Sequence, residues 1–326
     1  MGNIQTHPKP TVSIVIPAYN TASLIGTCLD SVLSQTYRDF EIMVVNDGSP
    51  DTAQLEQALR PYRDKIIYIV QENKRAAGAR NTAIRQSRGE FLAFLDSDDS
   101  WFPEHLASQM ELFDQDPNVD LTYADALLIS DGRHQKRFTE RCPSQGEATF
   151  ESLVVEQCQI PISTVVARKA AILQAGLFDE SLVRCDDYDM WLRTAFFGRK
   201  IAYTGRLQAR LYQGRPDSLG LSLAKMSEAD LQILEKLAQT LPLTEAQRKI
   251  VNQRVTGIRA RYLLEEGKVQ LREGHPERAR QLLAEANVHL RRFRLSLAIQ
   301  GLRLAPQSAA ALISVWNRWR GALMVR

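Results

Sequence analysis

The chain is organised around one stretch, residues 89–103, with the sequence Gly-Glu-Phe-Leu-Ala-Phe-Leu-Asp-Ser-Asp-Asp-Ser-Trp-Phe-Pro. Its apolar residues 91–95 predict a buried strand, and three carboxylates follow within four positions. If the chain stays extended, the side chains of Asp96 and Asp98 point to the same side. Two like charges repel each other unless a cation lies between them, and oxygen ligands suit Mg²⁺ or Mn²⁺. The alternative is a solvated acidic turn that caps a helix beginning at Pro103.

Strands and helices alternate on the N-terminal side of this stretch. Apolar runs at 12–16, 40–45 and 66–70 predict three more strands, and helix-spaced apolar residues follow each of them. Units of about 30 residues imply right-handed crossovers between parallel strands. We therefore expect an α/β fold with a doubly wound, mostly parallel sheet.

Polar residues follow every one of these strands. They are residues 17–20, 46–49 and 96–99, and residues 72–73 with 80–81 after the third strand. In open α/β sheets, ligands bind beyond the carboxyl ends of the strands. Four polar clusters at one edge of the sheet therefore predict a binding pocket there.

The chain beyond residue 103 supplies further elements. Residues 121–129 and 163–167 predict strands, and the polar residues 132–147 predict a mobile loop near the pocket. Residues 187–197 predict a helix, with the acidic pair 186–187 at its N-terminus, where the dipole favours carboxylates. This pair could serve the pocket or only cap the helix.

Length and charge indicate two domains. A chain of 326 residues with 44% hydrophobic and 24% charged residues is typical of a soluble protein with about two domains. Residues 1–222 hold 23 Lys and Arg against 29 Asp and Glu, whereas residues 223–326 hold 18 against 9. We expect a domain at 1–222 and a basic helical region at 223–326 with different partners.

Several classes of protein are disfavoured. The four cysteines are widely spaced and form no Cys-x-x-Cys pair, which argues against a zinc site and against a disulfide scaffold. No apolar run precedes Thr11, and no stretch reaches the roughly 18 apolar residues of a membrane span. We therefore expect a cytoplasmic protein without a signal peptide.

Five motifs, in this order, carry a resemblance to a known family: residues 12–20, 44–49, 79–81, 94–101 and 186–192. They resemble the family 2 glycosyltransferases with the GT-A fold, over roughly residues 11–222. The resemblance implies an inverting, metal-dependent enzyme. It would move a sugar from a nucleotide-diphospho-sugar, usually a uridine one, to a hydroxyl of a glycan or glycolipid, in cell-surface polysaccharide synthesis.

The resemblance also implies roles for single residues. Asp187 would be the general base, Asp98 would ligate the Mg²⁺ or Mn²⁺, and Asp47 would bind the uracil edge. The remaining donor-binding residues would be Pro17 and Tyr19 around the base, Arg80 near the nucleotide or its diphosphate, and Asp96 near the ribose.

Three positions depart from the family pattern. Arg75 stands where glycine is frequent, and the acidic pair is Asp186-Asp187 rather than Glu-Asp. Arg215 replaces a histidine and cannot ligate a metal. It could pair with the donor diphosphate, or this loop could have drifted.

Other functions fit the same sheet. A sugar nucleotidyltransferase would need a Gly-rich basic loop after the first strand, and residues 17–20 do not supply one. A dehydrogenase would need Gly-x-Gly-x-x-Gly at the same place, which is also missing. A non-catalytic, membrane-associated protein that kept the GT-A fold remains an alternative.

The basic region has a helical period throughout. Thr244 and Gln247 form a capping-box pattern, and residues 265–286 resemble one tetratricopeptide-type hairpin. Residues 286–326 contain seven arginines and no acid, and combine them with tryptophans on amphipathic helices. This pattern predicts binding to an anionic membrane surface, at the inner face of the cytoplasmic membrane. The alternative is a helical lid on the acidic domain; no nucleic-acid recognition motif is present.

Overall fold

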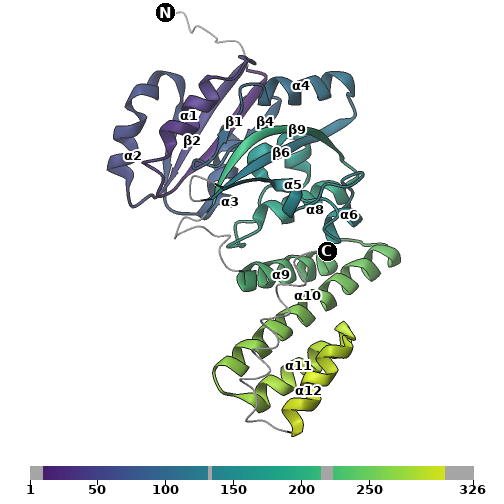
Figure 1. Cartoon of the computed structure of the whole chain (residues 1–326). Helices are drawn as coiled ribbons and strands as arrows, with labels where there is room; N and C mark the ends of the chain where they lie inside the picture. The colour runs from purple at the N-terminus through teal and green to yellow at the C-terminus, as the bar shows by residue number, and fades with distance from the viewer. Residues whose placement is uncertain (1–9, 131–133, 214–222, 305–326) are drawn as a thin grey trace, which may run out of the picture. The chain divides into compact units, whose positions relative to one another are not determined.

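The computed structural model describes residues 10–130, 134–213 and 223–304 (Figure 1). The chain divides into two compact units, Met1–Leu221 and Ser222–Arg326. Each unit is described by itself.

The first unit alternates strands and helices. In chain order its elements are β1 (Val12–Ala18), α1 (Ile25–Leu33), β2 (Phe40–Asp47), α2 (Thr52–Leu59), the 3₁₀ helix η1 (Arg60–Lys65), β3 (Ile67–Gln71), α3 (Arg75–Gln86), β4 (Phe91–Phe94), β5 (Ser100–Trp101), α4 (His105–Gln115), β6 (Val119–Ser130), β7 (His134–Arg137), α5 (Phe138–Arg141), α6 (Phe150–Val154), the 3₁₀ helix η2 (Ile162–Thr164), β8 (Val166–Arg168), α7 (Lys169–Gln174), α8 (Asp186–Phe196) and β9 (Lys200–Gln213).

One sheet runs through this unit in the order β3-β2-β1-β4-β8-β6-β9-β5, and β7 pairs with β6. The four strands predicted at 12–16, 40–45, 66–70 and 91–95 are all present as β1, β2, β3 and β4. They pair in parallel, in the order β3, β2, β1, β4. Beyond β4 the sheet is mixed, because β8 runs antiparallel to β4 and β6 while β9 runs parallel to β6. The predicted α/β class is confirmed, with its parallel part in the N-terminal half.

The core lies against the parallel strands. Ile14, Val15 and Ile16 of β1, whose side chains alternate between the two faces of the sheet, are fully buried, as expected for a strand covered on both faces. Helix α4 buries Leu106 and Phe113 as predicted, but it begins at His105 rather than at Pro103. Ser100 and Trp101, which precede Pro103, pair with β9 and form the short strand β5. The sequence did not indicate this strand.

Two segments differ from the prediction. The described part of the polar loop 132–147 begins with β7, which pairs antiparallel with β6, and with α5. Asp125 of β6 holds α5 by accepting hydrogen bonds from the backbone and hydroxyl of Thr139. The strand predicted at 163–167 begins only at Val166. Ser163 and Thr164 form a 3₁₀ turn, because their hydroxyls bond to Asp99 and to the carbonyl of Pro161.

The second unit is helical: α9 (Leu223–Thr240), α10 (Glu245–Arg272), α11 (Pro276–Leu290) and α12 (Phe293–Leu304). The predicted capping box of Thr244 and Gln247 starts α10. Helices α10 and α11 form the predicted hairpin, and a Cβ on Gly267 would lie 2.8 Å from the Leu283 side chain, so the two helices pack closely. None of the described helices has the length and apolar character to cross a membrane.

Candidate functional site

The carboxyl ends of β2, β1 and β4 lie side by side and bring several predicted residues together. Pro17 pairs with Val45 of β2, two residues before Asp47. On its other side, β1 pairs with β4 up to Val15 and Phe94. Two positions after this last pair, β1 reaches Pro17 and the segment after β4 reaches Asp96. The polar clusters therefore meet at one edge of the sheet, as expected.

Asp47 is a buried carboxylate that the end of β3 holds in place. Its Oδ1 accepts hydrogen bonds from Gln71 Nε2 at 2.7 Å and from the Lys74 backbone at 2.8 Å. Gly48 adopts φ +62°, and a Cβ there would lie 2.8 Å from the backbone nitrogen of Asn73. Both bonds use Oδ1, so Oδ2 can accept the hydrogen bond predicted for the base.

Gln71 was not predicted from the sequence, although it pairs directly with Asp47 in the β2–β3 register. The predicted third strand stopped one residue earlier, at 70. Extending that strand by one position would have placed an amide opposite Asp47, and this is the signal that could have found it.

The loop after β1 is tied to the loop after β2. The backbone of Asn20 donates to Ser49 Oγ at 2.7 Å, and the backbone of Ala22 donates to Asp51 Oδ2 at 2.8 Å. Tyr19 lies between the end of β1 and the bonded residue Asn20, and 49% of its surface is exposed. The phenol ring is therefore held on an anchored loop yet open to a ligand.

Arg80 of α3 is buried between two carboxylates. Its Nη2 lies 2.7 Å from Asp96 Oδ1 and its Nη1 lies 2.6 Å from Asp186 Oδ2. Burial by itself lowers the pKa of Arg80, but the two carboxylates raise it above the ordinary value, so the cation persists. The guanidinium thus joins the acidic turn after β4 to the start of α8. Its predicted contact with the donor stays a prediction.

The next residue, Asn81, ties the same helix to the chain before α8. Its amide nitrogen donates to the carbonyl of Phe178 at 2.8 Å, and its amide oxygen accepts from the Phe178 backbone at 3.0 Å. The Arg-Asn pair is therefore a double link from α3 to the segment that leads into α8. The sequence alone did not indicate this structural role of Asn81.

The three carboxylates after β4 have separate surroundings. Asp96 reaches Arg80, whereas Asp99 is buried and accepts from Ser163 Oγ at 2.6 Å and from the Tyr212 backbone at 3.0 Å. Burial, with the charges of Asp98 and Asp96, raises the pKa of Asp99 well above its ordinary value. Asp98 is partly exposed and lies between them in sequence.

This acidic turn suits a divalent cation whose remaining coordination positions are filled by a bound ligand and water. Three carboxylates, Asp96, Asp98 and Asp99, lie within four positions of this turn, and Arg80 pairs with one of them, Asp96. Within residues 10–130, 134–213 and 223–304, no three His, Cys, Asp or Glu side chains converge to hold a metal ion by themselves. Mg²⁺ typically binds through one or two carboxylates plus phosphate oxygens and water, so Asp98 with a bound diphosphate fits this pattern.

Asp187 lies in the first turn of α8, next to the residue that pairs with Arg80. Burial and the neighbouring charge of Asp186 raise the pKa of Asp187 to about 7, although Arg80 lowers it. A carboxylate with a pKa near neutrality can accept a proton from a hydroxyl and release it again. Asp186 therefore forms an ion pair with Arg80, and the role of Asp187 as the general base stays a prediction.

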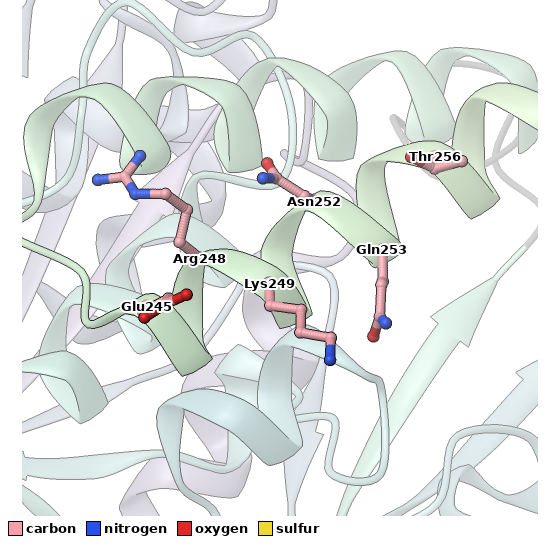
Figure 2. Close-up of a pocket in the computed structure, with 6 residues that line it drawn as sticks. All are labelled: Glu245, Arg248, Lys249, Asn252, Gln253 and Thr256. Carbon is pink, nitrogen blue, oxygen red and sulfur yellow. The ribbon is translucent and has the colours of Figure 1, made fainter.

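Arg215 lies outside the described residues. A polar hollow of about 530 Å³ lies on α10 of the second unit and contains none of the predicted site residues (Figure 2). Its six lining side chains come from one face of that helix: Glu245, Arg248, Lys249, Asn252, Gln253 and Thr256.

Comparisons with known proteins give the family and the fold. Residues 13–171 match the profile described as Glycosyl transferase family 2. An uncharacterized glycosyltransferase of Rickettsia typhi is 34% identical over 193 residues, which is 57% of this chain and 58% of that protein. The chain thus matches less than two thirds of that relative's length. The Escherichia coli UDP-Glc:alpha-D-GlcNAc-diphosphoundecaprenol beta-1,3-glucosyltransferase WfgD is 32% identical, over 56% of this chain and 68% of that protein.

Solved structures share the fold. Staphylococcus aureus TarS 1–349 superposes with a TM-score of 0.62 at 20% identity, covering 97% of this chain and 93% of that one. The mannosyltransferase PcManGT from Pyrobaculum calidifontis, solved with GDP-Man and Mn²⁺, gives a TM-score of 0.59 at 19% identity, covering 95% and 84%. These likenesses confirm the predicted GT-A architecture.

Proposed function

Because this chain belongs to glycosyl transferase family 2, we propose that it transfers a sugar from a nucleotide-diphospho-sugar to a hydroxyl of a glycan or lipid-linked glycan. One observation carries the proposal. Arg80 bridges Asp96 and Asp186, and so links the edge of the sheet where a donor would bind to Asp187, a carboxylate with a pKa of about 7.

The proposed donor is a UDP-sugar. Asp47 has one carboxylate oxygen fixed by Gln71 and Lys74, and its other oxygen is suited to accept from the N–H of a uracil edge. Pro17 and Tyr19 lie at the end of the neighbouring strand and would flank the base. The name of WfgD includes a UDP-sugar donor and a diphosphoundecaprenol-linked acceptor, which supports the same classes here.

A divalent ion, Mg²⁺ or Mn²⁺, is part of the proposal, with Asp98 as its protein ligand and Asp96 near the ribose. When bound, such an ion supplies positive charge that stabilises the departing nucleotide diphosphate. The three carboxylates gathered at this turn, one of them the partly exposed Asp98, support the assignment. Arg215 would add charge on the diphosphate; it lies outside the described residues.

Asp187 is the proposed general base. The acceptor oxygen would form a bond to the anomeric carbon as the bond from that carbon to the diphosphate oxygen breaks. The acceptor proton would pass to the Asp187 carboxylate. A single displacement of this kind inverts the anomeric centre, so inversion is part of the proposal. We place the reaction at the cytoplasmic face of a membrane, where a lipid-linked acceptor would be available.

The test is a screen of nucleotide sugars for nucleotide release that depends on added Mg²⁺ or Mn²⁺. Asp187→Asn should lower turnover by about 10²–10⁴-fold while donor binding, measured by calorimetry, is retained. Asp64→Asn, an exposed carboxylate of η1, is the matched control and should remain fully active.

Two outcomes would overturn the proposal. Equal turnover in Asp187→Asn would reject the base. Absence of metal-dependent nucleotide binding would favour a non-catalytic protein that kept the fold, and release of pyrophosphate from sugar phosphate and nucleoside triphosphate would favour a nucleotidyltransferase.

A further inference from the structure

Helix α12 is apolar on two opposite faces. Leu295 and Leu302 are 4% and 1% exposed, and they belong to the core that α10, α11 and α12 form together. Phe293, Leu297 and Leu304, in contrast, are 75%, 55% and 82% exposed. Figure 1 shows α12 beside α11, with its other side uncovered by any described helix of this unit. We call the exposed side, with Phe293, Leu297 and Leu304, the outer face of α12.

The outer face is mostly apolar, and the exposed Gln300 is a polar residue that lies on it between Leu297 and Leu304. Phe293, Leu297 and Leu304 are separated by four and seven residues, which places them on one side of an α-helix. Leu295 lies about 200° around the helix from Phe293, and Leu302 about 180°. A helix on the surface of a soluble domain normally carries polar residues opposite its core face. Among the described helices of this unit, none covers the outer face of α12.

Arginines border this face on both sides. Arg294 lies about 100° from Phe293 in one direction and Arg303 about 80° in the other, and both are exposed. Arg291 and Arg292, also exposed, form the turn that leads into the helix. No acidic residue occurs from 286 to the last residue, 326, so α12 and the turn before it carry positive side chains and no negative one.

We propose that the outer face of α12 docks on an anionic lipid bilayer. Leucine and phenylalanine side chains would enter the boundary between headgroups and acyl chains. The guanidinium groups of Arg294 and Arg303 would reach lipid phosphates on either side, as long basic side chains do at such boundaries. The inference goes beyond sugar transfer and does not depend on it.

Other occupants fit the charge less well. A second copy related by two-fold symmetry would bring the same arginines against each other. Residues 305–326 add three arginines and no acid, so their docking on this face would also concentrate positive charge. A nucleic acid would pair with the arginines but would leave the apolar side chains of the outer face without an apolar partner.

Vesicle sedimentation with the full chain tests the inference. We expect binding to phosphatidylcholine vesicles that contain phosphatidylglycerol, and at least tenfold weaker binding to phosphatidylcholine alone. The triple variant Phe293→Ser, Leu297→Ser, Leu304→Ser and the double variant Arg294→Gln, Arg303→Gln should each lose at least tenfold. Tyr262→Ser and Arg278→Gln change an exposed aromatic and an exposed arginine elsewhere in the unit and should bind as the wild type does.

Each contrary result is distinct. Unchanged binding by the triple variant, or equal binding to neutral and anionic vesicles, overturns the inference. A wild-type dimer that becomes a monomer in the triple variant, without vesicle binding, assigns the face to a second copy and also overturns it. Vesicle binding is measured without donor, so failure here leaves nucleotide release untouched, and failure of nucleotide release leaves vesicle binding untouched.

Discussion

Arg80 of α3 and Asp186 at the start of α8 form a buried ion pair, with 2.6 Å between Nη1 and Oδ2, across 106 positions of sequence. The same guanidinium holds Asp96, so one side chain fixes the acidic turn and the proposed base relative to each other. A rigid planar group with several donors is suited to this double contact in a way that lysine is not.

Removing this cation should destabilise the first unit. Arg80→Met leaves two carboxylates near each other in a buried place, which costs about 3–5 kcal/mol of unfolding free energy. Arg80→Lys keeps the charge but cannot bond to both partners, so we expect an intermediate loss. Urea unfolding measures both. Arg85→Met is the control on the same helix, because its pair with Glu180 is exposed and 3.7 Å long, and its loss should cost about 0–1 kcal/mol. Equal losses at 80 and 85 would contradict the role of Arg80.

The proposed base should set the pH dependence of turnover. The pKa of Asp187 is raised to about 7, so the carboxylate form accumulates as pH rises through 7. We expect kcat/KM to rise about tenfold per pH unit below 7 and to level off above it. Asp186→Asn removes a negative charge that raises this pKa, so its acidic limb should move to lower pH. An acidic limb that stays at the same pH in Asp186→Asn would show that another group titrates.

Neighbouring carboxylates of the acidic turn should respond differently to the same substitution. Asp98→Asn removes the proposed metal ligand and should lower turnover by about 10²–10³-fold with little change in stability. Asp99→Asn can keep the bond from the Tyr212 backbone and donate to Ser163, so turnover should stay within about tenfold of the wild type. Asp99→Ala leaves both partners unpaired and should cost about 1–3 kcal/mol in urea unfolding. A larger loss of turnover in Asp99→Asn than in Asp98→Asn would reverse the assignment.

The parallel half of the sheet could be predicted because its signals are local. Each strand from β1 to β4 is a short apolar run followed by polar residues, and the order of such runs determines which end of the sheet they share. The mixed half could not be predicted in the same way. Ser100 and Trp101 pair with β9, more than a hundred positions later, and nothing in two residues indicates such a partner.

In the candidate site, too, residues with a local sequence signal could be predicted, and residues that depend on distant contacts could not. Asp47, Asp96 and Asp187 stand beside strand or helix ends and could be found from position and motif. The residues that support Asp47 and Asp96 could not, because Gln71 and Ser163 act through hydrogen bonds to residues 24 and 67 positions away. Even for Arg80, the motif indicated the residue, whereas only the fold shows that two carboxylates share its guanidinium.

His105 should make the protein sensitive to acid. Its ring is fully buried and stacked on Trp101 with 4.3 Å between centroids, and in the described part of the chain neither ring nitrogen has a hydrogen-bond partner. Burial lowers its pKa from 6.5 to about 3, so the unfolded chain binds a proton at pH values where the folded protein does not. This difference leaves stability intact above pH 6.5 and removes it progressively as pH falls toward 3.

The loss from His105 at pH 5 should be about 2 kcal/mol. His105→Phe keeps an aromatic ring against Trp101, buries no unpaired nitrogen and should be at least as stable as the wild type at neutral pH. Urea unfolding of both proteins at pH 7.5 and 5.0 isolates the contribution, because all other titrating groups are common to them. The exposed His275→Gln is the control and should lose as much stability on acidification as the wild type. If His105→Phe also loses as much as the wild type, the folded protein must accommodate a protonated ring at this position, and its burial would then not determine the response to acid.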